Sequence, residues 1–257
     1  MKVARDGRIV LWDGGSLWGF DVPPRPDAAA PSTRLHAHHA LQLTLSAGGR
    51  FSIRTEDGRT PGPLVLISPD TPHAFEPEGR IALLFVEPES RAGRALLSEL
   101  NGAPVARLEP ERLPDAVREL ALFWVEPRAS DEAVAAVGQR MLSQLVGSAP
   151  PASSLDHRIT RAIGWILPRI EEPLTLGQAA DVACLSESRF SHLFVEETGL
   201  PFRTWVLWRR LMRSVELMAA GETLTSAAHR AGFSDSAHFS RTFLRMFGVQ
   251  ASALGLV

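Results

Sequence analysis

The chain has 257 residues, a formal net charge of −2 and a sequence pI of about 6.5. With 45% apolar and 22% charged residues, it lacks the composition of a disordered chain and is long enough for two domains. Its single cysteine, Cys184, excludes an intrachain disulfide. We find no apolar run long enough for a membrane helix and no charged-then-apolar leader, so we expect a cytoplasmic protein without membrane contact.

Residues 1–90 alternate short apolar runs with turn-forming clusters such as Asp13-Gly14-Gly15. Many short strands at regular spacing indicate a β-sandwich or β-barrel. The predicted strands are Ile9–Trp12, Leu17–Phe20, Leu41–Leu45, Phe51–Arg54, Leu64–Ile67 and Ile81–Val86.

Histidines are the candidate site residues of this β region. His36, His38 and Gln42 have the parity of one strand face, whereas His39 has the opposite parity and is expected to face solvent. His73 follows a tight turn that leads into a later strand. Such residues could line a pocket for a small molecule, and three neutral imidazoles could alternatively hold zinc or iron.

The same histidines resemble the cupin pattern, in which a His-x-His pair, a glutamate and a later histidine line the mouth of a β-barrel. Gln42 stands where cupins have glutamate, which removes a charge and weakens divalent-metal binding. We therefore favour a pocket for a small effector, with no metal or other cofactor. The alternative is a metal site of His36, His38 and His73, in a metal sensor or metalloenzyme fused to DNA-binding helices. The candidate pocket residues are Trp12, Trp18, His36, His38, Gln42 and His73, with Phe20, Phe75 and Phe85 as further candidate walls.

After Pro88 the apolar residues take helical spacing, as in Val134, Val137, Met141 and Leu145. We predict that residues 91–147 form helices that cover the barrel or provide a dimer interface. Residues 148–154 are small, polar and proline-bearing, which is typical of a linker. Residues 155–257 are predicted to be almost wholly helical.

This helical part contains an internal repeat. Nine positions carry the same residue in two blocks, with an offset of 48 residues in the first block and 49 in the second. Each copy reads as a short helix with small alanines, a tight turn, a serine at the expected N-cap and a second helix with two inward phenylalanines. The first block pairs Leu176, Ala179, Ala180, Ala183 and Ser186 with Leu224, Ala227, Ala228, Ala231 and Ser234. In the second block, Phe190 to Gly199 pairs with Phe239 to Gly248.

Two helix-turn-helix units indicate a DNA-binding protein, because the outward side chains of each second helix are types that can read base edges. A solvated helix face is the alternative for one unit alone, and the repetition weighs against it. The predicted base-reading residues are Glu187, Ser188, Arg189, Ser191, His192, Ser236, Ala237, His238, Ser240 and Arg241.

One long helix, from Phe202 to about Ala220, is predicted to join the units. At 1.5 Å per residue it would span roughly 27 Å, close to the ~34 Å between successive major-groove faces on one side of B-DNA. Residues 155–257 contain 11 Arg or Lys and 10 Asp or Glu, a net charge of about +1, which predicts modest non-specific affinity for DNA. The predicted phosphate contacts are Ser186, Arg203, Arg209, Arg210 and Ser234.

Residues 155–254 resemble the DNA-binding domain of AraC/XylS-type transcription regulators. The match is most specific in Gly232-Phe233-Ser234-Asp235 and in Phe239-Ser240-Arg241-Thr242-Phe243. The resemblance implies a domain that reads two adjacent major grooves, and promoter control governed by a separate, barrel-shaped sensor domain. The family's Thr-Pro after the final glycine is replaced by Val249-Gln250-Ala251, which puts contacts at the extreme C-terminus in doubt.

The sequence thus predicts an α+β protein of two domains: an N-terminal cupin-like β-barrel with trailing helices, and an all-α C-terminal domain of two helix-turn-helix units. The expected function is a sequence-specific transcription regulator, an activator or a repressor, whose barrel senses a small-molecule effector. Paired catalytic carboxylates and a nucleophilic serine motif are absent, so we expect no enzyme activity. Double-stranded promoter DNA and the effector are the expected partners, with RNA polymerase and a second copy of the chain as further candidates.

Overall fold

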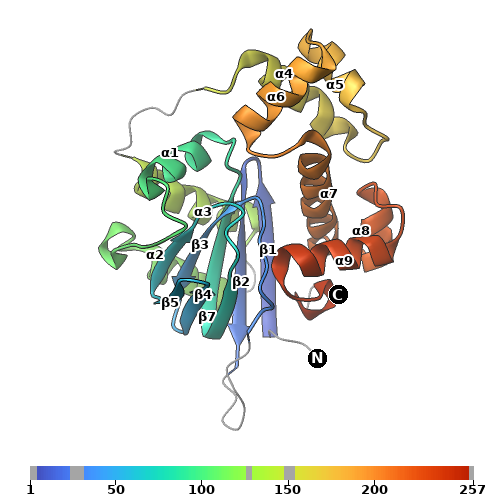
Figure 1. Ribbon diagram of the computed structural model, residues 1–257. Coiled ribbons are helices and arrows are strands. Elements are labelled where there is room, and N and C mark those ends of the chain that lie inside the picture. The colour runs from blue at the N-terminus through green and yellow to red at the C-terminus, as the bar shows by residue number, and fades with distance from the viewer. Residues whose placement is uncertain (1–4, 24–31, 126–128, 148–153, 255–257) are drawn as a thin grey trace. The chain divides into compact units, whose positions relative to one another are not determined.

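The computed structural model describes residues 5–23, 32–125, 129–147 and 154–254 (Figure 1). Contacts divide the chain into two units, one formed by residues 1–151 with 243–256 and the other by residues 152–242. Within the described residues, no helix is long and apolar enough to cross a membrane.

The first unit is built on an antiparallel sheet in which strand order is β1-β2-β7-β3-β6-β8, with β4 pairing both β5 and β7. Every strand predicted from the sequence is present. The structure adds β5, β8 and the first half of β7, whose sequences are too short or too polar to show an apolar alternation. The strands are β1 (Arg5–Trp12), β2 (Gly15–Val22), β3 (Leu41–Ser46), β4 (Arg50–Thr55), β5 (Gly58–Pro61), β6 (Leu64–Ile67), β7 (Ala74–Val86) and β8 (Val105–Arg107).

The long strand β7 connects the parts of this sheet. Its first half, Ala74–Glu78, pairs with β4, and its second half, Gly79–Val86, lies between β2 and β3. In that second half Ala82, Leu84 and Val86 pack into the core cluster under the helices. The residues of opposite parity, Ile81, Leu83 and Phe85, line a pocket instead. Both faces of the strand are buried, which is why its sequence is a continuous apolar run.

Three helices cover one face of the sheet: α1 (Arg91–Leu100), α2 (Ala116–Val125) and α3 (Asp131–Val146), with a 3-10 turn η1 (Pro110–Arg112) between the first two. Their apolar side chains, among them Leu96, Leu120 and Met141, share one core cluster with strand residues such as Leu17 and Leu43. These side chains therefore pack the three helices against the sheet.

The second unit is helical, as predicted. Pro168 ends the first of its helices, which continues only as a 3-10 turn. The first helical pair encloses a core of small alanines and large rings, including Ala180, Phe190 and Trp205. The elements are α4 (His157–Ile166), η2 (Leu167–Arg169), α5 (Leu176–Ala183), α6 (Glu187–Thr198), α7 (Phe202–Ala219), α8 (Leu224–Arg230), α9 (Ser236–Phe247) and η3 (Ala251–Leu254).

The sequence repeat is also a repeat of hydrogen bonds. Thr175 and Thr223, 48 residues apart, both cap a helix by accepting the amide N–H three residues ahead. In the two turns, the amide of Leu185 donates to Ala180 O, and the amide of Phe233 donates to Ala228 O, at 2.9 and 3.0 Å. The second helices end at Gly199 and Gly248, both with positive φ. Matching bonds at matching offsets confirm that the unit is duplicated.

The two copies differ at the start of the second helix. Ser186 caps α6, as predicted, by accepting the amide of Arg189 at 3.3 Å. The predicted cap Ser234 does not hold the same position, because Asp235 accepts the amide of His238 at 2.7 Å while the Ser234 hydroxyl donates to Asp235. The one-residue insertion between the sequence blocks moves the cap from the serine to the aspartate that follows it.

Candidate nucleic-acid interface and sensor pocket

The predicted reading face of α6 is accessible. Glu187, Ser188, Arg189 and His192 are exposed and Ser191 is half-buried, whereas Phe190 and Phe194 on the opposite face are fully buried. The apolar face therefore fixes which way the helix is rotated, and the polar side chains are left free to meet a ligand.

The corresponding face of α9 is less exposed than that of α6. Ala237 and Arg241 are exposed, and Ser236, His238 and Ser240 are half-buried. The imidazole of His238 packs edge-on against the Phe233 ring at 5.2 Å. Arg241 is therefore the exposed residue of this face with hydrogen-bond donors suited to a base edge.

The three arginines of α7 predicted to contact phosphate have different surroundings. Arg203 is exposed, and the guanidinium of Arg209 lies 5.7 Å from the ring centre of Trp205. Arg210 instead donates to Ile170 O at 2.9 Å and to Glu172 O at 2.7 Å. Two of its donors are thus used to hold α7 against the segment after η2, and burial lowers its pKa.

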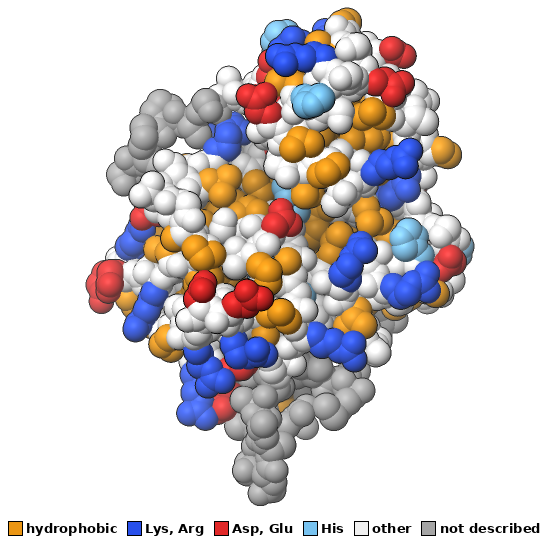
Figure 2. All heavy atoms as spheres, in the orientation of Figure 1, with side chains coloured by type: hydrophobic (Ala, Val, Ile, Leu, Met, Phe, Trp, Pro, Cys, Tyr) orange, Lys and Arg blue, Asp and Glu red, His pale blue; other side chains and the backbone are white. Residues whose placement is uncertain are grey.

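Arginine and histidine side chains, blue and pale blue in Figure 2, gather over α8 and α9. Part of this charge is neutralised within the unit, because Arg230 pairs with Glu222 and Arg213 pairs with Glu216. The surface of the helical unit therefore has local positive patches on an almost neutral background.

In the first unit, a pocket opens on the sheet face that the helices do not cover. The predicted residues Trp18, His36 and Gln42 line it. Phe20, Phe75 and Phe85, expected as candidate walls, line it as well. Thr33 and the aliphatic part of the wall were not predicted, although the alternation in β7 carries the signal for Ile81 and Leu83. The sheet residues of that wall are Phe20, Val22, Phe75, Pro77, Ile81, Leu83 and Phe85.

Trp12, also predicted for the pocket, lies elsewhere. Its ring packs against α3, where a Cβ on Gly138 would come within 2.5 Å of it. The parity of β1 and its pairing with β2 turn this ring toward the helices, so the pocket prediction for Trp12 is corrected.

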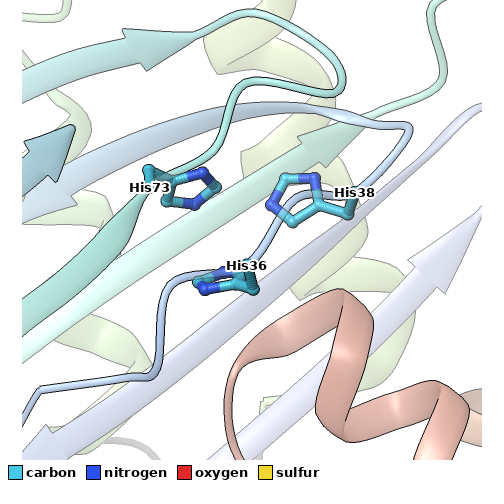
Figure 3. Close-up of side chains that lie close together, drawn as sticks. All are labelled: His36, His38 and His73. Carbon is cyan, nitrogen blue, oxygen red and sulfur yellow. The ribbon is translucent and has the colours of Figure 1, made fainter. Parts of the chain in front are cut away.

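The three histidines of the predicted constellation do meet (Figure 3). His36 and His38 lie on the segment before β3, and His73 lies just before β7, across an isolated bridge between His36 and His73. One ring nitrogen of each lies within 4.8 Å of those of the other two. The expectation that His36 and His38 belong to a regular strand is wrong, since only His36 makes a strand-like pairing.

Burial makes these imidazoles neutral. It lowers the pKa of His36 to about 3 and the pKa of His38 well below its ordinary value, and the pKa of His73 falls for the same reason. The proximity of the rings lowers the pKa of His36 and His38 further, because two neighbouring imidazolium ions would repel each other.

His39 is buried rather than exposed, which corrects the prediction from parity. Its Nε2 lies 3.2 Å from Glu89 Oε2. Burial alone would lower its pKa, but the hydrogen bond and charge of Glu89, with Glu87 and Asp70 nearby, raise the pKa of His39. The bends at residues 39–40 end the alternation on which the parity argument depended.

Comparison with known proteins places these sites in context. A family model described as "Helix-turn-helix domain" matches residues 179–254. The chain is 24% identical to the HTH-type transcriptional regulator NimR of Escherichia coli over 83% of this chain and 79% of that protein. It is 31% identical to the HTH-type transcriptional activator RhaS of Enterobacter sp., over 36% of this chain and 34% of that relative.

Among solved structures, ToxT from Vibrio cholerae aligns over 95% of this chain and 98% of its own, with a TM-score of 0.61 and 12% identity. That likeness shows a shared fold of a sheet-based first part and a helical second part. The alignment with ToxT includes both parts, and the duplicated turns and caps lie in the helical part. The chain therefore carries a helix-turn-helix domain in residues 179–254, and the relatives to which it is similar are transcription regulators.

Proposed function

We propose that this protein is a transcription regulator that binds promoter DNA in a sequence-specific way and responds to a small molecule held in its N-terminal unit. The observation that supports this proposal best is that the helix-turn-helix unit occurs twice with matching hydrogen bonds. Each copy presents a polar face on its second helix. The protein then acts by binding rather than by catalysis, in the compartment that holds the DNA.

The base-reading residues of this proposal are Arg189 and His192 on α6 and His238 and Arg241 on α9, with the smaller side chains between them. Arginine reads guanine through two donors, and serine or histidine can meet several acceptors. Phosphate contacts come from Arg203, Arg209 and the exposed ends of the capping turns at Ser186 and Ser234. We assign Arg210 mainly to holding α7, because two carbonyls already occupy its guanidinium.

The pocket supports an effector that is mostly apolar and carries a small polar group. Its walls are aromatic and aliphatic, and Thr33, His36 and Gln42 are the polar residues among the described sheet-side lining. ToxT structures have been solved with an unsaturated fatty acid and with (E)-4-(8-methylnaphthalen-1-yl)but-3-enoic acid, both of which combine an apolar body with a carboxyl group. RNA polymerase and a second copy of the chain, joined through residues 111–146, remain proposed partners.

A binding-site selection from random duplex DNA with the full chain tests the function. We expect recovery of a site with two conserved blocks about one helical turn apart, since each recognition helix would occupy one major groove. Recovery of no enriched sequence would contradict the proposal.

Arg241→Ala tests the assignment of α9 to base reading. On the selected site, binding should weaken by about 1–3 kcal/mol, and preference should relax at a single base position. Arg161→Ala is the matched control, because Arg161 is an exposed arginine of α4 that belongs to neither face. Equal losses on selected and random DNA would make Arg241 a phosphate contact instead.

A further inference from the structure

The pocket of the first unit is mostly apolar. Among the described residues that line it, none is an arginine, lysine, aspartate or glutamate. Trp18 and Phe85 form part of its wall and meet edge to face, with ring centres 4.9 Å apart. The indole N–H of Trp18 is already used, because it donates to Ser16 Oγ at 2.9 Å. The described wall therefore offers a ligand aromatic and aliphatic surface and no ion to pair with.

His36 supplies a hydrogen-bond acceptor to this pocket. Its Nδ1 lies 2.8 Å from Arg34 O, and a carbonyl oxygen can only accept, so Nδ1 carries the ring proton. Burial lowers the pKa of His36 to about 3, and the ring is therefore neutral. The lone pair of Nε2 then accepts, and none of the described residues donates to it.

Thr33 supplies a hydrogen-bond donor beside the same ring, with its Oγ1 3.4 Å from His36 Nδ1. This oxygen accepts the backbone N–H of Phe75 at 2.9 Å. Its hydroxyl hydrogen has no acceptor among the described residues and can be donated to a ligand. Gln42, the other polar residue of the described lining, already donates to the Thr44 hydroxyl at 2.9 Å.

A second acceptor lies next to His36. The ring centres of His36 and His73 are 4.3 Å apart, and Nε2 of His73 is buried with no hydrogen-bond partner in the described part of the chain. Nδ1 of His73 lies 2.8 Å from Thr71 O, so this ring also has its proton on Nδ1 and a lone pair on Nε2. Two neutral acceptors close together favour a ligand that donates, and they disfavour an anion, whose oxygens can only accept.

We propose that the pocket binds an uncharged aromatic molecule that bears a hydroxyl group, and that it discriminates against carboxylates. The ring of this ligand packs on the wall formed by Trp18 and Phe85. Its hydroxyl donates to His36 Nε2 and accepts from the Thr33 hydroxyl. A carboxylate in the same place would lose its water without meeting a cation, which costs more free energy than its apolar part regains.

This inference rests on the proposed function, because it takes the same pocket as the effector site and names the chemical class of the effector. The two ToxT ligands named above carry a carboxyl group, so this chain would select a different class. The test needs no DNA. Failure of the ligand comparison leaves the binding-site selection standing, and failure of that selection leaves the ligand comparison standing.

The full chain, in a buffer that contains a chelator, is titrated by calorimetry at neutral pH with 2-naphthol and with 2-naphthoate. The two probes share the same fused rings, and only the second is charged at neutral pH. We expect 2-naphthol to bind at least about tenfold more tightly than 2-naphthoate. Equal or tighter binding of 2-naphthoate would overturn the proposal, and so would binding of neither probe.

His36→Leu tests the contact with the hydroxyl group. Naphthalene, which lacks that group, should bind the original chain about three- to tenfold more weakly than 2-naphthol does. In His36→Leu this difference should disappear, because the acceptor is gone. Met141→Leu is the control, since Met141 is buried in the core under the helices, and it should keep the difference.

Thr33→Val provides a second variant if His36→Leu does not fold. It removes the donor and keeps the shape of the side chain, so the difference between 2-naphthol and naphthalene should shrink by about half or more. A full difference in folded His36→Leu, or in folded Thr33→Val where His36→Leu does not fold, would overturn the placement of the hydroxyl and with it the proposal.

Discussion

At the turn before α9, Gly232 has a φ of +83°, a conformation that side chains with a Cβ adopt only with strain. A Cβ there would also lie 2.9 Å from Arg210 Nε and 3.0 Å from Glu171 O. The turn thus depends on glycine for two independent reasons, its backbone angle and the close approach of Arg210.

Gly232→Ala should therefore lower the free energy of unfolding of the helical unit by about 1–2 kcal/mol. Urea unfolding followed by helical circular dichroism measures the change. Gly164→Ala is the control, because Gly164 lies within α4 and a Cβ there meets no atom within 4 Å. That variant should gain roughly 0.5–1 kcal/mol from helix propensity, and a loss of equal size in both would contradict the account of the turn.

At the scale of the helices, the N-cap of α9 is formed by Asp235. The His238 amide that Asp235 accepts, the Ser234 hydroxyl and the charge of Arg241 hold the pKa of Asp235 below its ordinary value. The carboxylate form therefore stabilises the folded state above the ordinary aspartate pKa, and this stabilisation is lost as the pH falls through the lowered value.

Asp235→Ala should lower the melting temperature at neutral pH, whereas Ser234→Ala should lower it clearly less. Thermal unfolding of both variants decides between the two caps. With Asp235→Asn, a neutral cap, the acid side of the stability profile should become flatter than in the original chain. A larger loss for Ser234→Ala would show that the cap is Ser234, as the internal repeat predicts.

The elements themselves were largely predictable from sequence. Alternating or continuous apolar runs located six strands, and the repeat located four helices of the second unit because each copy carried its own turn and cap. Strand β8 has only three residues, Val105–Arg107, and β5 reads Gly-Arg-Thr-Pro, so neither contains enough periodicity to be recognised.

The sites were predictable only where a residue's environment is local. Phe190 and Phe239 face inward because of helical spacing, and that was predicted. His39, Trp12 and Arg210 depend on partners between 38 and 126 positions away, namely Glu89, Gly138 and the carbonyls of Ile170 and Glu172. Parity along one strand cannot reveal such partners, and it fails altogether where a bend interrupts the strand.

For the molecule as a whole, net charge determines how strongly DNA attracts the protein regardless of base sequence. A net charge of −2 for the chain means that attraction to DNA comes from a few local arginines and not from an overall positive field. Arg203→Ala and Arg209→Ala should each weaken binding about equally on all sequences and make the slope of log affinity against log salt shallower by roughly one.

Fluorescence anisotropy over a range of salt concentrations, on selected and on unrelated duplexes, measures that slope. Arg158→Ala serves as the control, since that arginine is already paired with Asp156 at 2.6 Å. An unchanged slope for Arg203→Ala would remove it from the set of phosphate contacts.

The two recognition helices, α6 and α9, are built alike but carry different side chains at matching positions of their outer faces. Arg189 of α6 corresponds to His238 of α9, and His192 corresponds to Arg241. A single chain would then meet its operator with a distinct head and tail, so the operator need not be a palindrome. Inverting such an operator in front of a gene would turn the bound protein to face upstream, and the orientation of the site would become part of the regulatory signal.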